Sequence, residues 1–459
     1  MTRLTRQITL TLYAIGSATI LAVAILNPAL LRDARRPGRF DAKTRWLASH
    51  PADWAAASEI SDGALDSPSP RRFQLWYAAY AHARRLAPHR ANTSVAFVRG
   101  GLFHWYELGP EDRRRVLEAA APLMKDPGFF WRMHTPLWQL TRNFAWLRRV
   151  APDTLEARQW LRDLAIVGGL FEDYRVLREE IRRERMEVFR SRRATHDIAA
   201  LMNLVPPQLD RADEPLVRGI LEELERRPVD VSKMSGFVEK LVQLAVRHDL
   251  QPLSGIAPLV TAEGMLRDVT RARAALALNR PSIATRIELT SAMAGSPEWS
   301  EYFCDRARYE ARQGKSTSAE AYLLRAAHSE PSLAVLAAGE ELAQAAGKTN
   351  DATNYRKQLE ARGRLPRSWT GTCGTELCTA ALATEYVLGS GARLELATTQ
   401  SDETSPYVEI FLDDALVAEG EVGELRAFEI PASPGLHRLE VRLVNPRTRN
   451  GAQRRVRLS

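Results

Sequence analysis

Gly314-Lys-Ser-Thr-Ser-Ala-Glu-Ala-Tyr322 recurs in altered form as Gly347-Lys-Thr-Asn-Asp-Ala-Thr-Asn-Tyr355. The glycine, the alanine and the tyrosine keep their places, and the second copy follows the first at an offset of 33 residues. That offset is close to the length of one helix–turn–helix unit of an α-solenoid. The two copies therefore predict that this part of the chain folds as stacked helical hairpins.

Small residues and a proline around this pair follow a regular spacing, at Ala307, Gly314, Ala319, Ala326 and Pro331. The spacing resembles that of tetratricopeptide repeats and covers residues 298–362. The resemblance implies pairs of antiparallel helices that stack into a solenoid and bind a protein partner along its surface. Two positions depart from the family, because Arg306 and Glu310 stand where it favours large apolar or aromatic residues.

The chain before this region predicts further amphipathic helices. Apolar residues recur every three or four positions, as at Leu216, Ile220 and Leu224, which is the pattern of a helix with one buried face. Helices are expected on this basis at residues 71–86, 110–123, 154–167, 213–227 and 232–248. No constant period links them. We therefore expect a mainly α protein whose body, residues 69–364, is an irregular, tetratricopeptide-like α-solenoid.

An apolar run near the N-terminus, residues 8–26, contains no charged side chain. About twenty apolar residues suffice to cross the core of a bilayer. A cleavable signal peptide is the alternative, but its small-residue site, Ala22-Val-Ala24, would lie inside the run rather than after it. We expect a transmembrane anchor in residues 1–31, with membrane contact through residues 8–28. A juxtamembrane linker and a first helix follow in residues 32–68.

The residues on the two sides of this apolar run give conflicting indications of its orientation in the membrane. Arginines follow the run at Arg32, Arg35, Arg36 and Arg39 and precede it at Arg3 and Arg6. The count of basic residues favours a body inside the cytoplasm. The very short N-terminal tail and the features of the C-terminal region favour a body outside it. We expect a single-pass protein of a bacterial inner membrane with most of the chain in the periplasm.

The net charge of +8 does not predict nucleic-acid binding. Of 64 basic residues only seven are lysine, a bias that a GC-rich bacterial genome produces by itself. Acidic residues are interleaved with the arginines, as at Glu179 and Arg183, the spacing that supports an exposed helix. Because no basic-aromatic binding motif accompanies the charge, we expect no nucleic-acid partner.

The three cysteines divide into a close pair and a single residue. Cys373 and Cys378 lie five positions apart among turn-forming residues and could close a small disulfide loop, which would indicate an oxidising compartment. Cys304 stands alone in a helical stretch and is expected to be a small buried apolar residue. No histidine or further cysteine near the pair completes a zinc site, so we expect no metal.

Short alternating segments replace the helical pattern in residues 365–459. Strands are expected at residues 393–398, 407–412, 427–430, 437–444 and 453–458. In the fourth of these, Leu439, Val441 and Leu443 share one face and charged residues the other. Asp413-Asp414 is expected to form a hairpin turn. The region predicts a small C-terminal β-sandwich.

A strand ending in an acidic turn, residues 407–417, is followed by residues 434–445 and by a terminal strand. This order resembles calcium-dependent xylan-binding carbohydrate-binding modules and implies their sandwich fold. The same resemblance implies a polysaccharide partner at the β domain. In those modules acidic residues after the asparagine hold calcium, but residues 446–455 contain no carboxylate. The resemblance therefore supports the fold and not the metal site.

Eight of the ten tryptophans precede residue 161, which predicts either an aromatic binding groove or an irregular helical core filled by large rings. The core is favoured, because Phe73, Trp76 and Tyr80 follow the apolar spacing of one helix. The densest polar-aromatic cluster is His104-Trp105-Tyr106, which is a candidate binding cluster.

Catalytic motifs are not found in the sequence. Gly347-Lys-Thr349 resembles the end of a phosphate-binding loop, but Leu342 replaces its first glycine. No catalytic residue and no cofactor are therefore expected. The sequence favours a membrane-anchored, non-enzymatic scaffold of the bacterial cell envelope, associated with surface polysaccharide synthesis or export. A glycan-binding β module on a helical stalk is the first alternative, and an enzyme using His104 with a carboxylate and a second histidine is the next.

Overall fold

The computed structural model describes residues 47–65, 71–195, 198–206, 208–227, 238–362, 367–370, 380–388, 392–398, 405–423, 426–431, 436–445 and 455–458. The apolar run at residues 8–26 and the Cys373–Cys378 pair lie outside these ranges. Within them, no helix combines the length and the apolar character needed to cross a bilayer. The chain divides into two compact units, Met1–Ala157 and Arg158–Ser459.

The described part of the first unit contains the helices α4 (Trp54–Ala64), α5 (Arg72–Leu86), α6 (Ala91–Phe103), α7 (Pro110–Leu123), α8 (Pro127–Thr141) and α9 (Phe144–Val150). The predicted helices at 71–86 and 110–123 are confirmed. Pro110 opens α7, because its fixed φ suits the first helical turn and the amide hydrogen it lacks would have no partner there. Trp76 is buried and stacks on Phe97 with ring centroids 4.0 Å apart, so the core interpretation holds for this ring.

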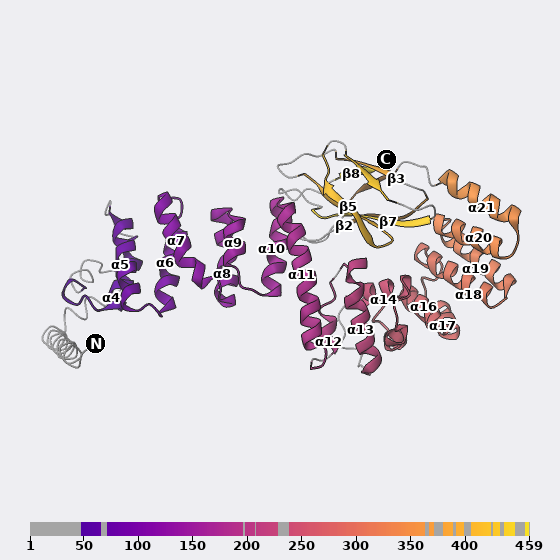
Figure 1. Ribbon diagram of the computed structural model, residues 1–459, viewed down its shortest axis with the longest axis horizontal. Helices are drawn as coiled ribbons and strands as arrows, with labels where there is room; N and C mark the ends of the chain where they lie inside the picture. The colour runs from indigo at the N-terminus through magenta and orange to yellow at the C-terminus, as the bar shows by residue number, and fades with distance from the viewer. Residues whose placement is uncertain are drawn as a thin grey trace. The chain divides into compact units, whose positions relative to one another are not determined.

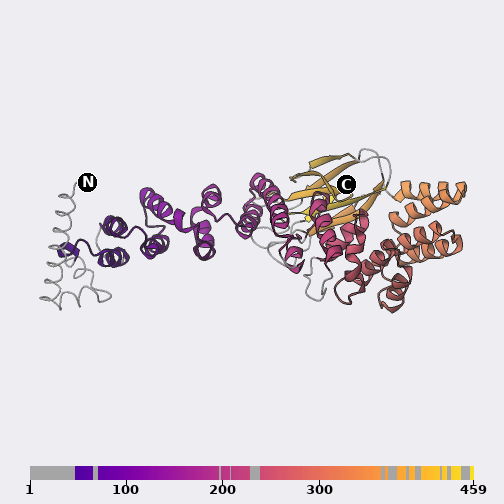
Figure 2. The same ribbon diagram turned by 60° about the horizontal axis from the view of Figure 1, so that its bottom comes forward.

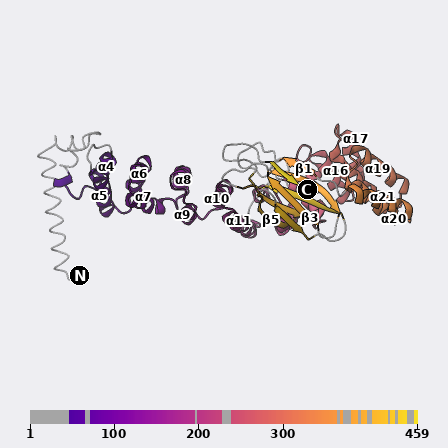
Figure 3. The ribbon, with the colours of Figure 1, turned by 90° about the horizontal axis from the view of Figure 1, so that it is seen from above.

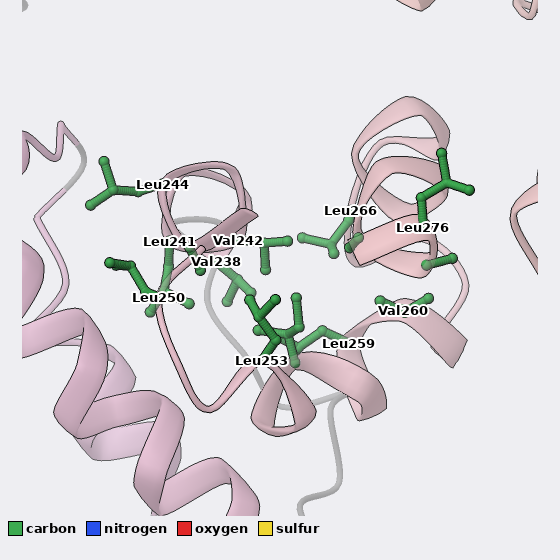
Figure 4. Close-up of a cluster of buried hydrophobic side chains, with 14 of the residues drawn as sticks. Val238, Leu241, Val242, Leu244, Leu250, Leu253, Leu259, Val260, Leu266 and Leu276 are labelled. Carbon is green, nitrogen blue, oxygen red and sulfur yellow. The ribbon is translucent and has the colours of Figure 1, made fainter. Parts of the chain in front are cut away.

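The second unit begins with the long helices α10 (Leu155–Gly168) and α11 (Phe171–Arg192). After them come α12 (Ile198–Met202), η1 (Arg211–Asp213), α13 (Glu214–Arg226), α14 (Val238–Arg247), η3 (Leu253–Ile256) and α15 (Ala257–Thr261). Its last helices are α16 (Asp268–Ala277), α17 (Pro281–Thr290), η4 (Pro297–Trp299), α18 (Ser300–Arg312), α19 (Ser316–Ser329), α20 (Leu333–Ala345) and α21 (Thr349–Arg362). Buried apolar residues from Phe189 on α11 to Ala338 on α20 form one core, of which Figure 4 shows the part where α14, η3, α15 and α16 converge.

The 33-residue repeat is confirmed by the last two hairpins. Helix α20 begins 33 residues after α18, and α21 begins 33 residues after α19. The hairpin of α16 and α17 precedes them in the same stack, and Figures 1 and 2 show the three hairpins packed in succession. The repeat therefore extends upstream of residue 298, where the sequence showed no period.

Five helices of this unit end in the same way. A residue one or two positions beyond the end of each helix adopts a left-handed conformation: Gly169, Asp249, Asn279, Gly314 and Gly347. The next amide then donates to the carbonyl five residues earlier, with N···O distances of 2.8–3.0 Å. This Schellman motif satisfies the last carbonyls of a helix and turns the chain back. The same turn geometry thus occurs at these five helix ends, although the left-handed residue is glycine, aspartate or asparagine.

The C-terminal strands are β1 (Arg367–Thr370), β2 (Ala380–Leu388), β3 (Ala392–Thr398), β4 (Tyr407–Leu412), β5 (Ala415–Glu421), β6 (Arg426–Ile430), β7 (Leu436–Leu443) and β8 (Arg455–Leu458). They form two antiparallel four-stranded sheets, in the orders β1-β8-β3-β6 and β2-β7-β4-β5. Figure 3 shows the strands from above. Apolar residues of both sheets share one core. The prediction of two packed antiparallel sheets is therefore confirmed. All five predicted strands are present, and β1, β2 and β5 are additional.

Helix α21 ends at Arg362 and β1 begins at Arg367, on either side of the boundary predicted at residue 364/365. The sandwich nevertheless belongs to the same compact unit as the helices that follow Arg158. Its packing against those helices is therefore part of the fold of the second unit.

Candidate functional site

The last two hairpins form a groove between their second helices. It has a volume of about 640 Å³ and is lined by residues of α19, α20 and α21. Leu323 and Leu336 are buried in its lining, whereas Leu324, which also lines it, is 69% exposed. This concavity is called here the α19–α21 groove. Concave, largely apolar surfaces of this volume are typical of sites that accept side chains of a ligand or partner.

A glycine determines how closely the helices of the groove approach. A Cβ atom at Gly339 on α20 would lie 2.6 Å from Cε1 of Tyr355 on α21, so only glycine admits the ring here. One repeat earlier the equivalent of Gly339 is Arg306, whose guanidinium lies 5.3 Å from the ring centroid of Tyr322. Arg306 also pairs with Glu310 at 2.7 Å, and both residues are buried. This pair explains how charged residues occupy positions where the tetratricopeptide pattern favours apolar ones.

A smaller concavity, of about 410 Å³, lies one repeat earlier, where α18 and α19 meet the loop after α17. Three of its lining residues have counterparts 33 positions later in the α19–α21 groove, pairing Phe303 with Leu336, Arg325 with Gln358 and Ser329 with Arg362. Leu324 lines both concavities. The same feature is therefore repeated along the stack, and one exposed leucine stands between its two copies.

The hairpin before these concavities also exposes large apolar side chains. Leu289, on α17, is 79% exposed, and Met293, in the loop after it, is 62% exposed. Large apolar side chains at such exposures are uncommon enough to mark an interaction surface when they gather on one face. The repeat region thus combines two concavities, which share the exposed Leu324, with further exposed apolar side chains on the preceding hairpin.

Charged residues at the edge of the groove carry both signs. Lys348 pairs with Glu320 across it, and Asp351 and Arg362 also line it. The hydrogen bond to Glu320 raises the pKa of Lys348 above its usual value. Because acidic and basic groups balance, the edge exerts no strong attraction on either sign of charge. Recognition at the groove would rest on its apolar lining.

A polar triad adjoins the smaller concavity and joins the buried Tyr302 and Glu288 to the exposed Arg325, which lines it. The Tyr302 hydroxyl donates to Oε2 of Glu288 at 2.9 Å, and Arg325 pairs with the other carboxylate oxygen. Burial and the charge of Glu288 raise the pKa of Tyr302, so its proton stays in place. The triad satisfies all three groups and supports the shape of the surface rather than offering a reactive group.

The candidate cluster at residues 104–106 is divided by the structure. Trp105 is buried, and the guanidinium of Arg113 lies 5.5 Å from its ring centroid. Tyr106 is 80% exposed. His104 Nδ1 lies 2.9 Å from Glu107 Oε1, at the end of α6. Whether the cluster binds a ligand remains a prediction, and its three side chains do not converge on one point.

His104 and Glu107 do form a histidine–carboxylate pair, as the enzyme hypothesis requires. Among the described residues no second histidine contacts this pair. Its carboxylate is also paired with Arg72, and the hydrogen bond from His104 together with these charges lowers the pKa of Glu107. The pair lies on an exposed turn between α6 and α7 rather than in a cleft.

The sandwich contributes a feature that the sequence did not reveal. Its outer charged face on β4 and β7 is buried, and all six residues of β4 are inaccessible. Glu409 accepts a 2.5 Å hydrogen bond from the Tyr174 hydroxyl and pairs with Arg178, both on α11. Arg442 donates from Nη2 to the carbonyl of Leu209 at 3.1 Å. The face that alternation alone assigns to solvent is the surface that packs against the helices.

Asp413-Asp414 forms the β4–β5 turn, as predicted, and both residues have positive φ. The Asp414 carboxylate lies 2.9 Å from His248 Nε2 and pairs with Arg247 and Arg438. Burial by itself would raise the pKa of Asp414, but these partners lower it far below its usual value. Each oxygen has a protein partner, so the turn serves to attach the sandwich to α14.

Reactive or metal-binding groups are scarce in the described part of the chain. No group of three or more His, Cys, Asp or Glu side chains within it could hold a metal ion. Cys304 is buried, which confirms its expected role as a small apolar residue. Burial raises the pKa of its thiol to about 12, so the nucleophilic thiolate is rare.

A sequence signal for the groove was present in the repeat itself, because Tyr355 and Gly347 mark the hairpin that forms it. The buried charges of the sandwich had no such signal. Comparison with known proteins adds nothing to this assignment, since no protein-family model and no curated protein matches the sequence.

Proposed function

We propose that the protein is a membrane-anchored, non-enzymatic scaffold that binds a protein partner along the second helices of its C-terminal repeats. The observation that carries this proposal is the α19–α21 groove and its repeat-related copy, joined by the exposed Leu324. A surface repeated at a constant interval suits an extended or helical segment, because such a segment can place apolar side chains into successive concavities.

The proposal assigns the sandwich a structural role. Its charged face is occupied by α11 and α14, so the β domain braces the helices that precede the repeats. The membrane segment at residues 8–28 and a periplasmic position in the bacterial envelope remain part of the proposal, as does the tetratricopeptide-like character of the repeats. A link to surface polysaccharide synthesis or export rests on the resemblance of the β domain alone.

The experiment that tests the scaffold is site-specific photo-crosslinking in intact cells. A benzoylphenylalanine at position 324 is expected to give a discrete adduct with one protein, because this side chain is exposed beside both concavities. The same probe at Val176 on α11, which is 44% exposed and outside the groove, is the matched control. Equal adducts at both positions, or none at 324, would refute binding at the groove.

Membrane orientation needs its own test, with reporters fused after Ser459. Activity of a periplasm-specific reporter supports an envelope scaffold. Activity of a cytoplasm-specific reporter would move the same scaffold to the inner side of the membrane. That outcome would remove the disulfide proposed for Cys373 and Cys378, because cytoplasmic thiols are kept reduced.

The alternative, a glycan-binding β module, is favoured by one further concavity. A space of about 640 Å³ lies between the start of α11 and β5, with Glu172, Glu421 and Arg426 in its lining. Such polar side chains can hydrogen-bond sugar hydroxyls, but the rings of Phe171 and Tyr407 beneath them are buried. Loss of polysaccharide binding in Glu421→Gln and Arg426→Ala would support this alternative, and binding that survives both would exclude it.

A further inference from the structure

The turn between α6 and α7 holds two aromatic side chains out of the protein. Phe103 is 86% exposed and Tyr106 is 80% exposed, the two highest values among the large exposed apolar residues of the described chain. Between and after them, Trp105 and Leu108 are buried. The turn therefore directs Trp105 and Leu108 into the core and directs Phe103, Tyr106 and Glu107 outward, so two of its three exposed side chains are aromatic.

The backbone of this turn is held firmly. The Leu108 amide donates to the His104 carbonyl at 3.2 Å, and the Glu107 amide donates to the same carbonyl at 2.9 Å. The Arg113 guanidinium donates to the carbonyl of Trp105 at 3.0 Å and lies over the tryptophan ring. Because the turn is anchored on a buried tryptophan, the two exposed rings do not rely on a partner to order them.

Basic groups surround the exposed rings. Arg99 lies one turn before Phe103 on the same face of α6 and is exposed. Arg72, from the start of α5, reaches the turn through its ion pair with Glu107. That carboxylate is shared between Arg72 and His104, and Glu111 at the start of α7 pairs with Arg114 and Arg115. The surface thus combines aromatic rings with cations and acids that already have partners.

We infer that this turn rests on the surface of the membrane, with Phe103 and Tyr106 inserted at the level of the headgroups. Aromatic side chains favour that level, and arginines beside them attract anionic headgroups. The inference depends on the proposed anchor. Residues 27–46 join the apolar run to the first described residues, and twenty residues reach at most about 70 Å. The first described residues therefore begin within about 70 Å of the proposed anchor, which makes a lipid surface a partner that this unit can reach.

The test uses the full chain reconstituted in vesicles of phosphatidylethanolamine and phosphatidylglycerol. An environment-sensitive fluorophore is attached at Phe103→Cys after the native cysteines are replaced. We expect a blue-shifted emission and quenching by lipids that carry a spin label near the headgroup. The same label at Arg85→Cys, exposed near the opposite end of α5, is the control and is expected to stay unquenched.

Each result has a distinct meaning. Quenching at 103 that disappears in vesicles of phosphatidylcholine alone supports the arginine contribution. Equal signals at 103 and 85, or no quenching at either, overturn the membrane contact while leaving the anchor and the groove intact. A blue shift that needs an added protein fraction and shows no lipid quenching assigns the turn to a protein and also overturns it. A chain that does not enter the vesicles overturns both this inference and the proposed anchor.

Discussion

The hydroxyl of Tyr174 lies 2.5 Å from Oε1 of Glu409, a residue 235 positions further along the chain. Tyr174 is on α11 and Glu409 is on the outer face of a β-sandwich strand. Both are buried, and Arg178 completes the contact by pairing with the same carboxylate. A charged strand face has therefore become an internal surface, because Glu409 finds partners on α11 and Glu440 and Arg442 pair with each other on β7.

Replacing Glu409 with alanine is expected to weaken the second unit strongly. The change would leave Arg178 without one of its carboxylates and the Tyr174 hydroxyl without its acceptor in a buried setting. Removing one partner of a buried ion pair typically costs about 3–5 kcal/mol. Urea unfolding followed by circular dichroism measures the loss. Glu172→Ala is the control, because Glu172 forms an exposed ion pair on α11, the helix that carries Tyr174 and Arg178. This variant should change stability little. Similar midpoints for the two variants would contradict a stabilising role for the contact.

Protonation of Asp414 at acidic pH is expected to weaken the contact between the sandwich and α14. Its pKa is lowered in the folded protein from an ordinary value of 3.8, so it contributes stability above that value. This contribution is lost as the pH falls through the lowered pKa, when the carboxylate takes up a proton. Asp414→Asn is expected to be less stable than the wild type at neutral pH and to lose less stability on acidification below about pH 4. Thermal unfolding across this range measures both curves. Parallel curves would show that another carboxylate controls the acid transition.

Gly339→Ala should disturb the α19–α21 groove. The added Cβ would meet the Tyr355 ring at 2.6 Å, so α21 or the ring must move. Overpacking of this kind costs about 1–3 kcal/mol. Gly295→Ala is a suitable control, because no atom lies within 4 Å of the Cβ it would add. Calorimetry of both variants compares the effects, and photo-crosslinking at position 324 tests the groove itself. An unchanged melting temperature for Gly339→Ala would mean that the helices separate there without cost.

Cys304 should resist thiol reagents in the folded protein. Its pKa of about 12 leaves about one thiol in ten thousand ionised at pH 8, and the side chain is buried. A variant with Cys373 and Cys378 replaced by serine allows this residue to be titrated alone with a chromogenic disulfide. Reaction is expected after unfolding in urea and not before. Rapid labelling of the native protein would show that α18 opens readily.

Much of the fold was predictable because it is encoded locally. The 33-residue interval between Gly314 and Gly347 identified the last two hairpins, and alternation identified β4 and β7. The turn at Asp413-Asp414 followed from residue type, since aspartate tolerates positive φ. The upstream hairpin was missed because Asn279 stands where later repeats have glycine, although both adopt the same turn.

The candidate site was predictable only in part. The sequence predicted that a partner would bind along the surface of stacked helical hairpins. The α19–α21 groove lies on the surface of those hairpins. It also singled out residues 104–106 as a unit, but the structure buries Trp105 and exposes Tyr106. Neighbouring residues on a turn point in different directions, so closeness in sequence does not make a common surface. Leu324 had no distinguishing signal, because an apolar residue on a helix is usually buried.

The sequence by itself determined that the body is helical, where five of the strands lie and where the last two hairpins repeat, because hydrophobic periodicity and turn residues act over a few positions. The tertiary structure decided that Glu409 and Asp414 face helices rather than water, and that Leu324 stays exposed between two concavities. The physical reason is that the hydrophobic periodicity of a segment indicates only which side of the helix or strand is apolar. What covers its other side depends on partners, such as Tyr174 and His248, that come from far along the chain.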